Sequence, residues 1–136
     1  MDDGQTNPEP RELPAMADHR IHLRRAWESP EGRVDLPVSG DQLPASSRLW
    51  RRFNRPPLDI SCERLLLICE DVPGLLEVTL NAQPLSMSGT DHLWDISAEA
   101  LRSFGNVLEL SINPAEVCRA ENWGRISLIV RTLPTP

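Results

Sequence analysis

The 136-residue chain contains no lysine and no tyrosine, only three cysteines, and only four tryptophans and two phenylalanines. Its 14 basic residues are therefore all arginine, and its 20 acidic residues leave a formal net charge of −6. A protein that mainly neutralises phosphates needs the opposite sign of charge, so the composition argues against a general nucleic-acid binder. No apolar run approaches the roughly 20 residues that a membrane-spanning helix requires, so we expect no membrane association.

The cysteines are Cys62, Cys69 and Cys118, an odd number without a Cys-x-x-Cys pair. Each has apolar or strand-like neighbours and no activating base nearby in the sequence, so we expect reduced structural thiols rather than a redox centre or a nucleophile. The amino terminus lacks the basic start and the apolar stretch of a secretory signal. Together these features predict a cytoplasmic protein.

Residues 1–18 differ in composition from the rest of the chain. They hold five acidic residues and one arginine, a net charge of −4, and have few large apolar side chains to offset the entropy of ordering. We predict a flexible acidic tail over 1–18 and one β-sandwich domain over 19–133. The remaining chain carries a net charge of only −2, so net charge is a weak argument against nucleic-acid binding by the folded domain. The stronger argument is that the sequence shows no face on which arginines interleave with exposed aromatics.

After the tail, short apolar stretches recur between turn residues at the spacing of an antiparallel sandwich or barrel. The stretch 64–69 is apolar on both parities, which predicts a central strand covered on both sides. Ser97 is placed to cap a single helical turn over 98–102. The predicted class is an all-β antiparallel sandwich with one short helical turn. Its expected strands cover 20–24, 34–38, 48–54, 64–69, 75–80, 107–112 and 126–131.

Two residues depart from an ideal strand or turn. Pro37 lies inside the stretch 34–38 and cannot donate a ladder hydrogen bond, which predicts an edge strand or a bulge there. Ala82 follows Asn81 in a tight connection where both central residues of a hairpin turn take positive φ, and glycine is preferred at that position.

Five motifs follow one another between residues 20 and 131. They are the strand 49–56 with Trp-Arg-Arg-Phe, the strand 63–72 ending in Glu-Asp-Val, the stretch 77–85 with Leu-Asn-Ala, the segment Trp94-Asp95-Ile96-Ser97, and the closing strand 106–110. In this order they resemble the sugar-binding domain of family 2 glycoside hydrolases. The resemblance implies a galactose-binding-like jelly roll and at most a binding role, because nothing in the chain resembles the catalytic barrel of those enzymes. Ala82 and Ser97 stand where the family usually has glycine and threonine.

The tryptophans are the candidate ligand-binding residues, because carbohydrate modules stack sugar rings on aromatic faces while loop polar groups bind the hydroxyls. Trp123 lies in a loop before the last strand, and Trp94 takes the place of a family aromatic that is usually in the core. Trp27 precedes a turn and Trp50 has the opposite parity from the apolar residues of its strand, so exposure is open for both. The predicted binding set is Trp123, Asn122, Trp94, His92 and Asp91.

We expect no catalytic residue, no metal and no cofactor. On a strand, the three-residue offset between His19 and His22 sends the two rings to opposite faces. The carboxylate pair Glu70-Asp71 lies in a turn rather than in a dry cleft. The chain has neither a Gly-x-Ser-x-Gly elbow nor a glycine-rich phosphate loop.

A local basic cluster comprises Arg48, Arg51, Arg52 and Arg55. Arginine can fork to a carboxylate or a phosphate, which permits an acidic sugar or the acidic tail of a partner as ligand, although we expect pairing with the chain's own acids. Two functions stay open. One is a non-catalytic module that binds carbohydrate through its end loops. The other is a protein-interaction or scaffold domain, including a homodimer, that uses an edge strand or a tryptophan patch.

Overall fold

The computed structural model of the chain describes residues 18–87, 92–97 and 101–134. Nearly all regular structure in these residues is β-strand, and two one-turn 3₁₀ helices lie at Gly40–Gln42 and Pro114–Glu116. The strands are β1 (Asp18–His22), β2 (Trp27–Ser29), β3 (Gly32–Val34), β4 (Val38–Ser39), β5 (Arg48–Phe53), β6 (Glu63–Glu70), β7 (Leu75–Leu80), β8 (Gln83–Pro84), β9 (Leu93–Asp95), β10 (Asn106–Ile112), β11 (Asn122–Trp123) and β12 (Arg125–Thr132).

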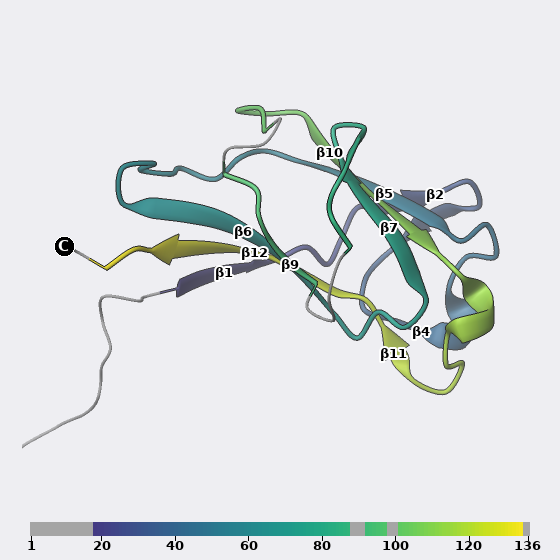
Figure 1. The fold of residues 1–136 in the computed structure, drawn as a ribbon. Helices are drawn as coiled ribbons and strands as arrows, with labels where there is room; N and C mark the ends of the chain where they lie inside the picture. The colour runs from purple at the N-terminus through teal and green to yellow at the C-terminus, as the bar shows by residue number, and fades with distance from the viewer. Residues whose placement is uncertain (1–17, 88–91, 98–100, 135–136) are drawn as a thin grey trace, which may run out of the picture.

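Two antiparallel sheets form the layers of a β-sandwich (Figure 1). The four-stranded sheet has the order β1-β12-β6-β9, and the six-stranded sheet has the order β3-β2-β5-β10-β7-β8. β4 and β11 pair with each other in a small separate ribbon. The predicted all-β antiparallel sandwich is confirmed at this level.

The core lies between the two sheets and follows the alternation of side chains along each strand. In β6, Leu65 and Leu67 are fully buried, and in β10 so are Leu108 and Leu110. Full burial of one leucine contributes about 1.5–3 kcal/mol relative to an exposed position. β6 lies between β12 and β9, so its predicted central position is confirmed. The expected cover on both sides is incomplete, because Ile68 on the outer face lines a hollow.

The predicted strand 34–38 is divided into two. β3 ends at Val34 on an edge of the six-stranded sheet, the Leu36–Pro37 peptide bond is cis, and Val38 pairs with Trp123 of β11. A single continuous strand was therefore the wrong expectation, because Pro37 has no N–H with which to continue the ladder. The edge position expected for this segment is correct for β3.

Two further sequence predictions concern the acidic tail and the short helical turn. β1 begins at Asp18, the last residue of the predicted tail, whose carboxylate accepts hydrogen bonds of 2.9 and 3.0 Å from Arg131. The tail prediction otherwise falls on residues 1–17, outside the described residues. The predicted helical turn over 98–102 falls mostly on residues 98–100, which also lie outside them, and Leu101 and Arg102 have no helical structure.

Candidate functional site

The candidate site lies on the face of the four-stranded sheet that points away from the core. Because Leu67 and Trp94 point inward to the core, their strand neighbours Ile68 and Leu93 point outward. The strand register aligns His22, Ser127, Ile68 and Leu93 in one row across all four strands. Leu93 is 42% exposed, so this outer face presents apolar surface to solvent.

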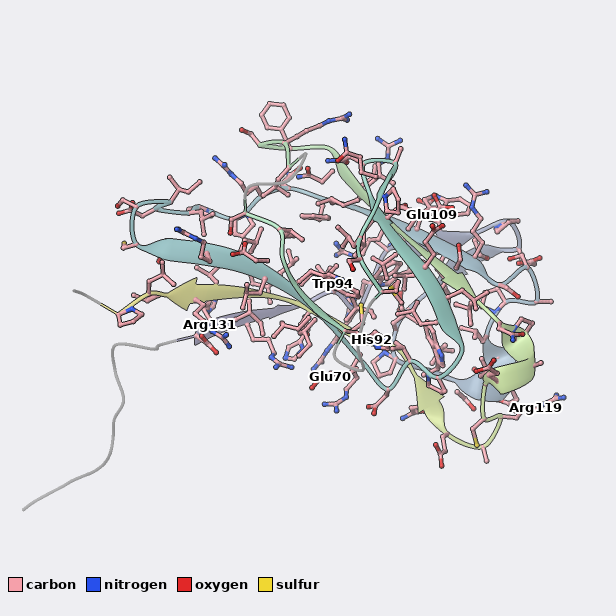
Figure 2. The ribbon with its side chains drawn as sticks, in the orientation of Figure 1. Glu70, His92, Trp94, Glu109, Arg119 and Arg131 are labelled. Carbon is pink, nitrogen blue, oxygen red and sulfur yellow. The ribbon has the colours of Figure 1, made fainter. Side chains whose placement is uncertain are left out.

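A hollow of about 500 Å³ lies on this face where β6 ends and β9 begins. Its lining consists of residues 68–73 together with His92 and Leu93. Figure 2 shows Glu70 and His92 at this end of the sheet, with Trp94 close to them. The volume is within the range of small-molecule binding sites, about 300–1,000 Å³.

The polar side of the hollow consists of two carboxylates that bind arginines. Arg20 donates from Nη1 to Oε1 of Glu70 at 3.0 Å, and Arg125 donates from Nε to Oδ2 of Asp71 at 2.8 Å. Within the described part of the chain, no protein donor reaches the second oxygen of either carboxylate. Those oxygens are placed to accept hydrogen bonds from the hydroxyl groups of a ligand.

Hydrogen bonds from Trp123 and Gly124 fix the turn that carries Asp71. Asp71 has a φ of 55°, in the left-handed region that Asp and Asn tolerate better than most residues. Its carbonyl accepts a hydrogen bond of 2.8 Å from the Gly124 N–H, and the Trp123 indole donates one of 2.9 Å to the Pro73 carbonyl. These contacts tie the turn to the segment that leads into β12.

We expected Trp123 to stack on a ligand, but the structure does not place it there. Its side chain is 1% exposed and packs in the core beneath the turn, so neither face of the indole is open to a sugar ring. Its neighbour Asn122 is exposed in β11, outside the lining of the hollow. The sequence neighbours of Trp123 suggested a loop, whereas its burial results from contact with the distant turn at Pro73.

His92 and Trp94 come together at the margin of the hollow. Their rings stack with centroids 6.0 Å apart and planes inclined by 21°. Trp94 is half-buried and donates from Nε1 to the Ser86 carbonyl at 2.6 Å, while the His92 carbonyl accepts from the Cys69 N–H at 2.9 Å. His92 lines the hollow, and its ring contacts Trp94, which is outside the lining. Asp91, the last of the predicted set, lies outside the described residues.

The hollow also contains residues that the sequence analysis had not placed in a binding site. Glu70 and Asp71 had been treated only as a solvated pair in a turn, and Leu93 had not been considered. Glu70 has the same parity as Ile68 in β6, so the alternation of side chains along the strand could have placed it on the outer face. The Arg20 and Arg125 contacts depend on pairing with β1 and β12, which no local pattern specifies.

The cysteine in the lining is not a nucleophile. Desolvation by burial, with a smaller contribution from the charge of Glu70, raises the pKa of the Cys69 thiol to about 12. The thiol is therefore protonated at neutral pH, and the reactive thiolate is absent. Among the residues that the structure describes, no three His, Cys, Asp or Glu side chains gather closely enough to hold a metal ion.

The other two tryptophans lie in different surroundings. Trp27 is fully buried and donates to the Leu23 carbonyl at 2.7 Å. Trp50 is half-buried on the outer face of the six-stranded sheet, with the Arg48 guanidinium 5.3 Å from its ring centre. Arg48 also forms an ion pair with Glu109.

The predicted arginine cluster is not a single unit. Arg48 pairs with an acid of the chain as expected, whereas Arg51 donates to the backbone carbonyls of Arg25 and Arg52. Desolvation lowers the pKa of Arg51 from its ordinary value. Arg52 and Arg55 form no ion pair within the described residues, so internal pairing accounts for only part of this cluster.

The chain matches no protein-family model and no curated protein. The resemblance to the sugar-binding domain of family 2 glycoside hydrolases therefore rests on the motifs of the sequence itself. In the described ranges, no helix has the length and apolar character needed to cross a membrane.

Proposed function

We propose that this chain is a non-catalytic β-sandwich module that binds a carbohydrate in the hollow at the end of β6. The observation that carries the proposal is the hollow itself, whose lining combines two carboxylates and His92 with apolar residues that include the exposed Leu93. Sugars present hydroxyl donors around a ring whose C–H faces are apolar, so both parts of this lining have a complement in a sugar.

The support differs from the aromatic stacking that the sequence suggested. Trp27 and Trp123 are buried in the core, so any sugar ring has to be held by the carboxylates, His92 and Leu93 instead. The protonated Cys69 thiol and the arginine partners of both carboxylates support a binding role rather than a catalytic one. Within this proposal the sandwich is a galactose-binding-like jelly roll, as the ordered motifs imply.

The direct test is a screen of the full chain against immobilised neutral and acidic glycans, followed by calorimetric titration of the best neutral ligand. Glu70→Gln and Asp71→Asn keep the shape of each side chain and remove its charge. Each change should weaken binding roughly tenfold, because a hydrogen bond to a charged acceptor contributes about 1.5 kcal/mol.

Glu109→Gln is the matched control, because Glu109, like Glu70, is a half-buried carboxylate paired with an arginine but lies in the six-stranded sheet. It should bind as the unmodified chain does. Thermal melting of all three variants checks that they fold. Absence of binding to every glycan, or equal weakening by all three substitutions, would contradict the proposal.

A protein-interaction role is the second candidate, and exposed apolar side chains favour it. Phe104 is 74% exposed in the loop before β10, and Ile60 is 57% exposed in the loop before β6. Light scattering over a range of concentrations tests this candidate. A dimer that dissociates in Phe104→Ser, together with no glycan binding, would favour a scaffold over a carbohydrate module.

A further inference from the structure

A second hollow lies at the margin of the same sheet, where β1 ends and β12 begins. It has a volume of about 340 Å³. Its lining combines an apolar floor with nitrogen-bearing side chains, and consists of Leu36, Pro37, Ile126, His22, Arg24 and Arg125.

The second hollow is basic, because no acidic residue is among those that line it. Arg24 is exposed and its side chain forms no hydrogen bond or ion pair within the described part of the chain. The His22 ring places Nδ1 3.2 Å from the Ser127 hydroxyl, which leaves Nε2 for another partner. Arg125 uses Nε for its ion pair with Asp71, so its two terminal nitrogens are available as donors.

One residue joins the second hollow to the first. Arg125 lines the second hollow, and its ion pair of 2.8 Å reaches Asp71 in the lining of the first. Arg125 is also the register partner of Glu70 across the β12–β6 ladder. The carboxylates of the first hollow and the cationic groups of the second therefore meet at a shared border.

We infer that the two hollows form one site for an acidic saccharide, in which the second hollow binds the carboxylate of a uronic acid through His22, Arg24 and Arg125. This inference rests on the proposed function, because the first hollow has to hold the hydroxyl groups of a sugar. The planar fork of arginine matches a carboxylate in two parallel hydrogen bonds. The exposed Pro37 provides contact for the ring carbons, whereas Leu36 and Ile126 are each 2% exposed and form the buried base of the hollow.

The experiment compares pairs of methyl glycosides that differ only at C6, such as a glucuronide with its glucoside and a galacturonide with its galactoside. Calorimetric titration of the full chain should show about tenfold tighter binding of at least one uronide over its neutral partner at low ionic strength. The preference should decrease as salt is added, because the guanidinium groups are exposed. A 6-sulfated glycoside serves as the arm that distinguishes a carboxylate site from a general anion site.

Arg24→Gln is the informative variant, since Arg24 lies outside the lining of the first hollow and has no protein partner to lose. It should reduce the preference for the uronide at least fivefold and leave binding of the neutral glycoside within twofold. Arg119→Gln is the matched control, because Arg119 is an exposed arginine without an ion pair in the described residues and lies far from Glu70 in Figure 2. It should keep the full preference.

The outcomes distinguish failure of the acidic-saccharide inference from failure of the proposed carbohydrate-binding function. Neutral glycosides that bind as tightly as uronides would overturn the acidic-saccharide inference and leave the carbohydrate module standing. No binding of either member of any pair would overturn the proposed function itself. A uronide preference that survives Arg24→Gln, or one that a sulfated glycoside or a polyglutamate peptide matches, would overturn the assignment of the second hollow to a uronic acid.

Discussion

In the turn between β7 and β8, Ala82 has the greater backbone strain of the two residues with positive φ. Asn81 and Ala82 have φ values of 51° and 68°, both in the left-handed region. Asparagine tolerates this region, whereas alanine has no such compensation and its Cβ approaches the following carbonyl. The turn is therefore of the kind in which Asn-Gly is the preferred pair.

Ala82→Gly should stabilise the protein by about 0.5–1 kcal/mol. The change relieves about 1–2 kcal/mol of left-handed strain, and the larger entropy of glycine in the unfolded chain offsets part of this gain. Urea denaturation followed by fluorescence should show a higher midpoint with an unchanged slope. Asn81→Gly at the neighbouring position should instead lower the midpoint, because it removes the side-chain hydrogen bonds of Asn81 with the Val107 N–H and with Asn106. A lower midpoint for Ala82→Gly would contradict the account.

Residues that local chemistry controls were the ones that could be predicted. The departure at Ala82 followed from turn preferences, and the opposite parity of Trp50 from the apolar residues of its strand followed from alternation, whereas its half-buried state did not. Trp123 could not be predicted in the same way, because its burial depends on the turn at Pro73, 50 positions away in the sequence. The same limit applies to Glu70, whose partner Arg20 lies on another strand.

Among the elements, β1 depends on an ion pair at its first residue. The bidentate contact with Arg131, as the largest cause, lowers the pKa of the Asp18 carboxyl below its ordinary value of 3.8. A carboxyl with a lowered pKa in the folded state contributes its stability above the unfolded pKa and loses it as pH falls through the folded value. Asp18 should therefore help to hold β1 at neutral pH and cease to do so at strongly acidic pH.

Asp18→Asn should lower the free energy of unfolding by less than about 1 kcal/mol at pH 7, because both side chains are substantially exposed. The difference from the unmodified protein should shrink as pH falls below about 4 and as salt is added. Urea midpoints of both proteins at pH 7 and pH 2.5 measure this change. A difference that stays constant between the two pH values would contradict the linkage.

At the element scale the sequence located most long strands within one or two residues. The strands β5, β6, β7, β10 and β12 follow from apolar alternation or from apolar runs. The prediction failed where pairing is non-local, as for the division of 34–38 between β3 and β4. β9 was recognised only as part of a motif, because a three-residue strand carries too little periodicity to stand out.

For the whole molecule, the main question is how the core positions the surface site. Trp27 and Trp123 are both fully enclosed indoles, and each donates one hydrogen bond to a backbone carbonyl. Only the Trp123 bond reaches the turn that carries Asp71. The Trp27 bond instead reaches Leu23, between His22 and Arg24 of the second hollow. The two residues therefore form a matched pair that separates core stability from the geometry of the first hollow.

Trp27→Phe and Trp123→Phe should each destabilise the protein by about 1–3 kcal/mol, because each leaves a carbonyl without its donor and removes buried volume. Only Trp123→Phe should also weaken binding of a neutral glycoside in the first hollow, by about threefold or more, at a temperature where both variants are folded. Chemical denaturation and calorimetric titration provide the two measurements. Equal binding by both variants would show that Trp123 contributes to the fold alone.

The antiparallel pairing of β1 with β12 also determines how the protein can be tethered. Asp18 lies opposite Arg131 at one end of the four-stranded sheet, whereas Arg125 lies opposite Glu70 towards the other end. The start of β1 and the end of β12 lie together at one end of the sheet (Figure 1). The residues that line the two hollows include Glu70 and Arg125 towards the other end, so a linker or immobilisation tag attached at residue 18 or 134 leaves from the side away from both hollows. Surface capture through either end should leave the site open to a ligand in solution, and a short peptide that joins the two ends should allow a circular permutant opened in the exposed loop that contains Ile60.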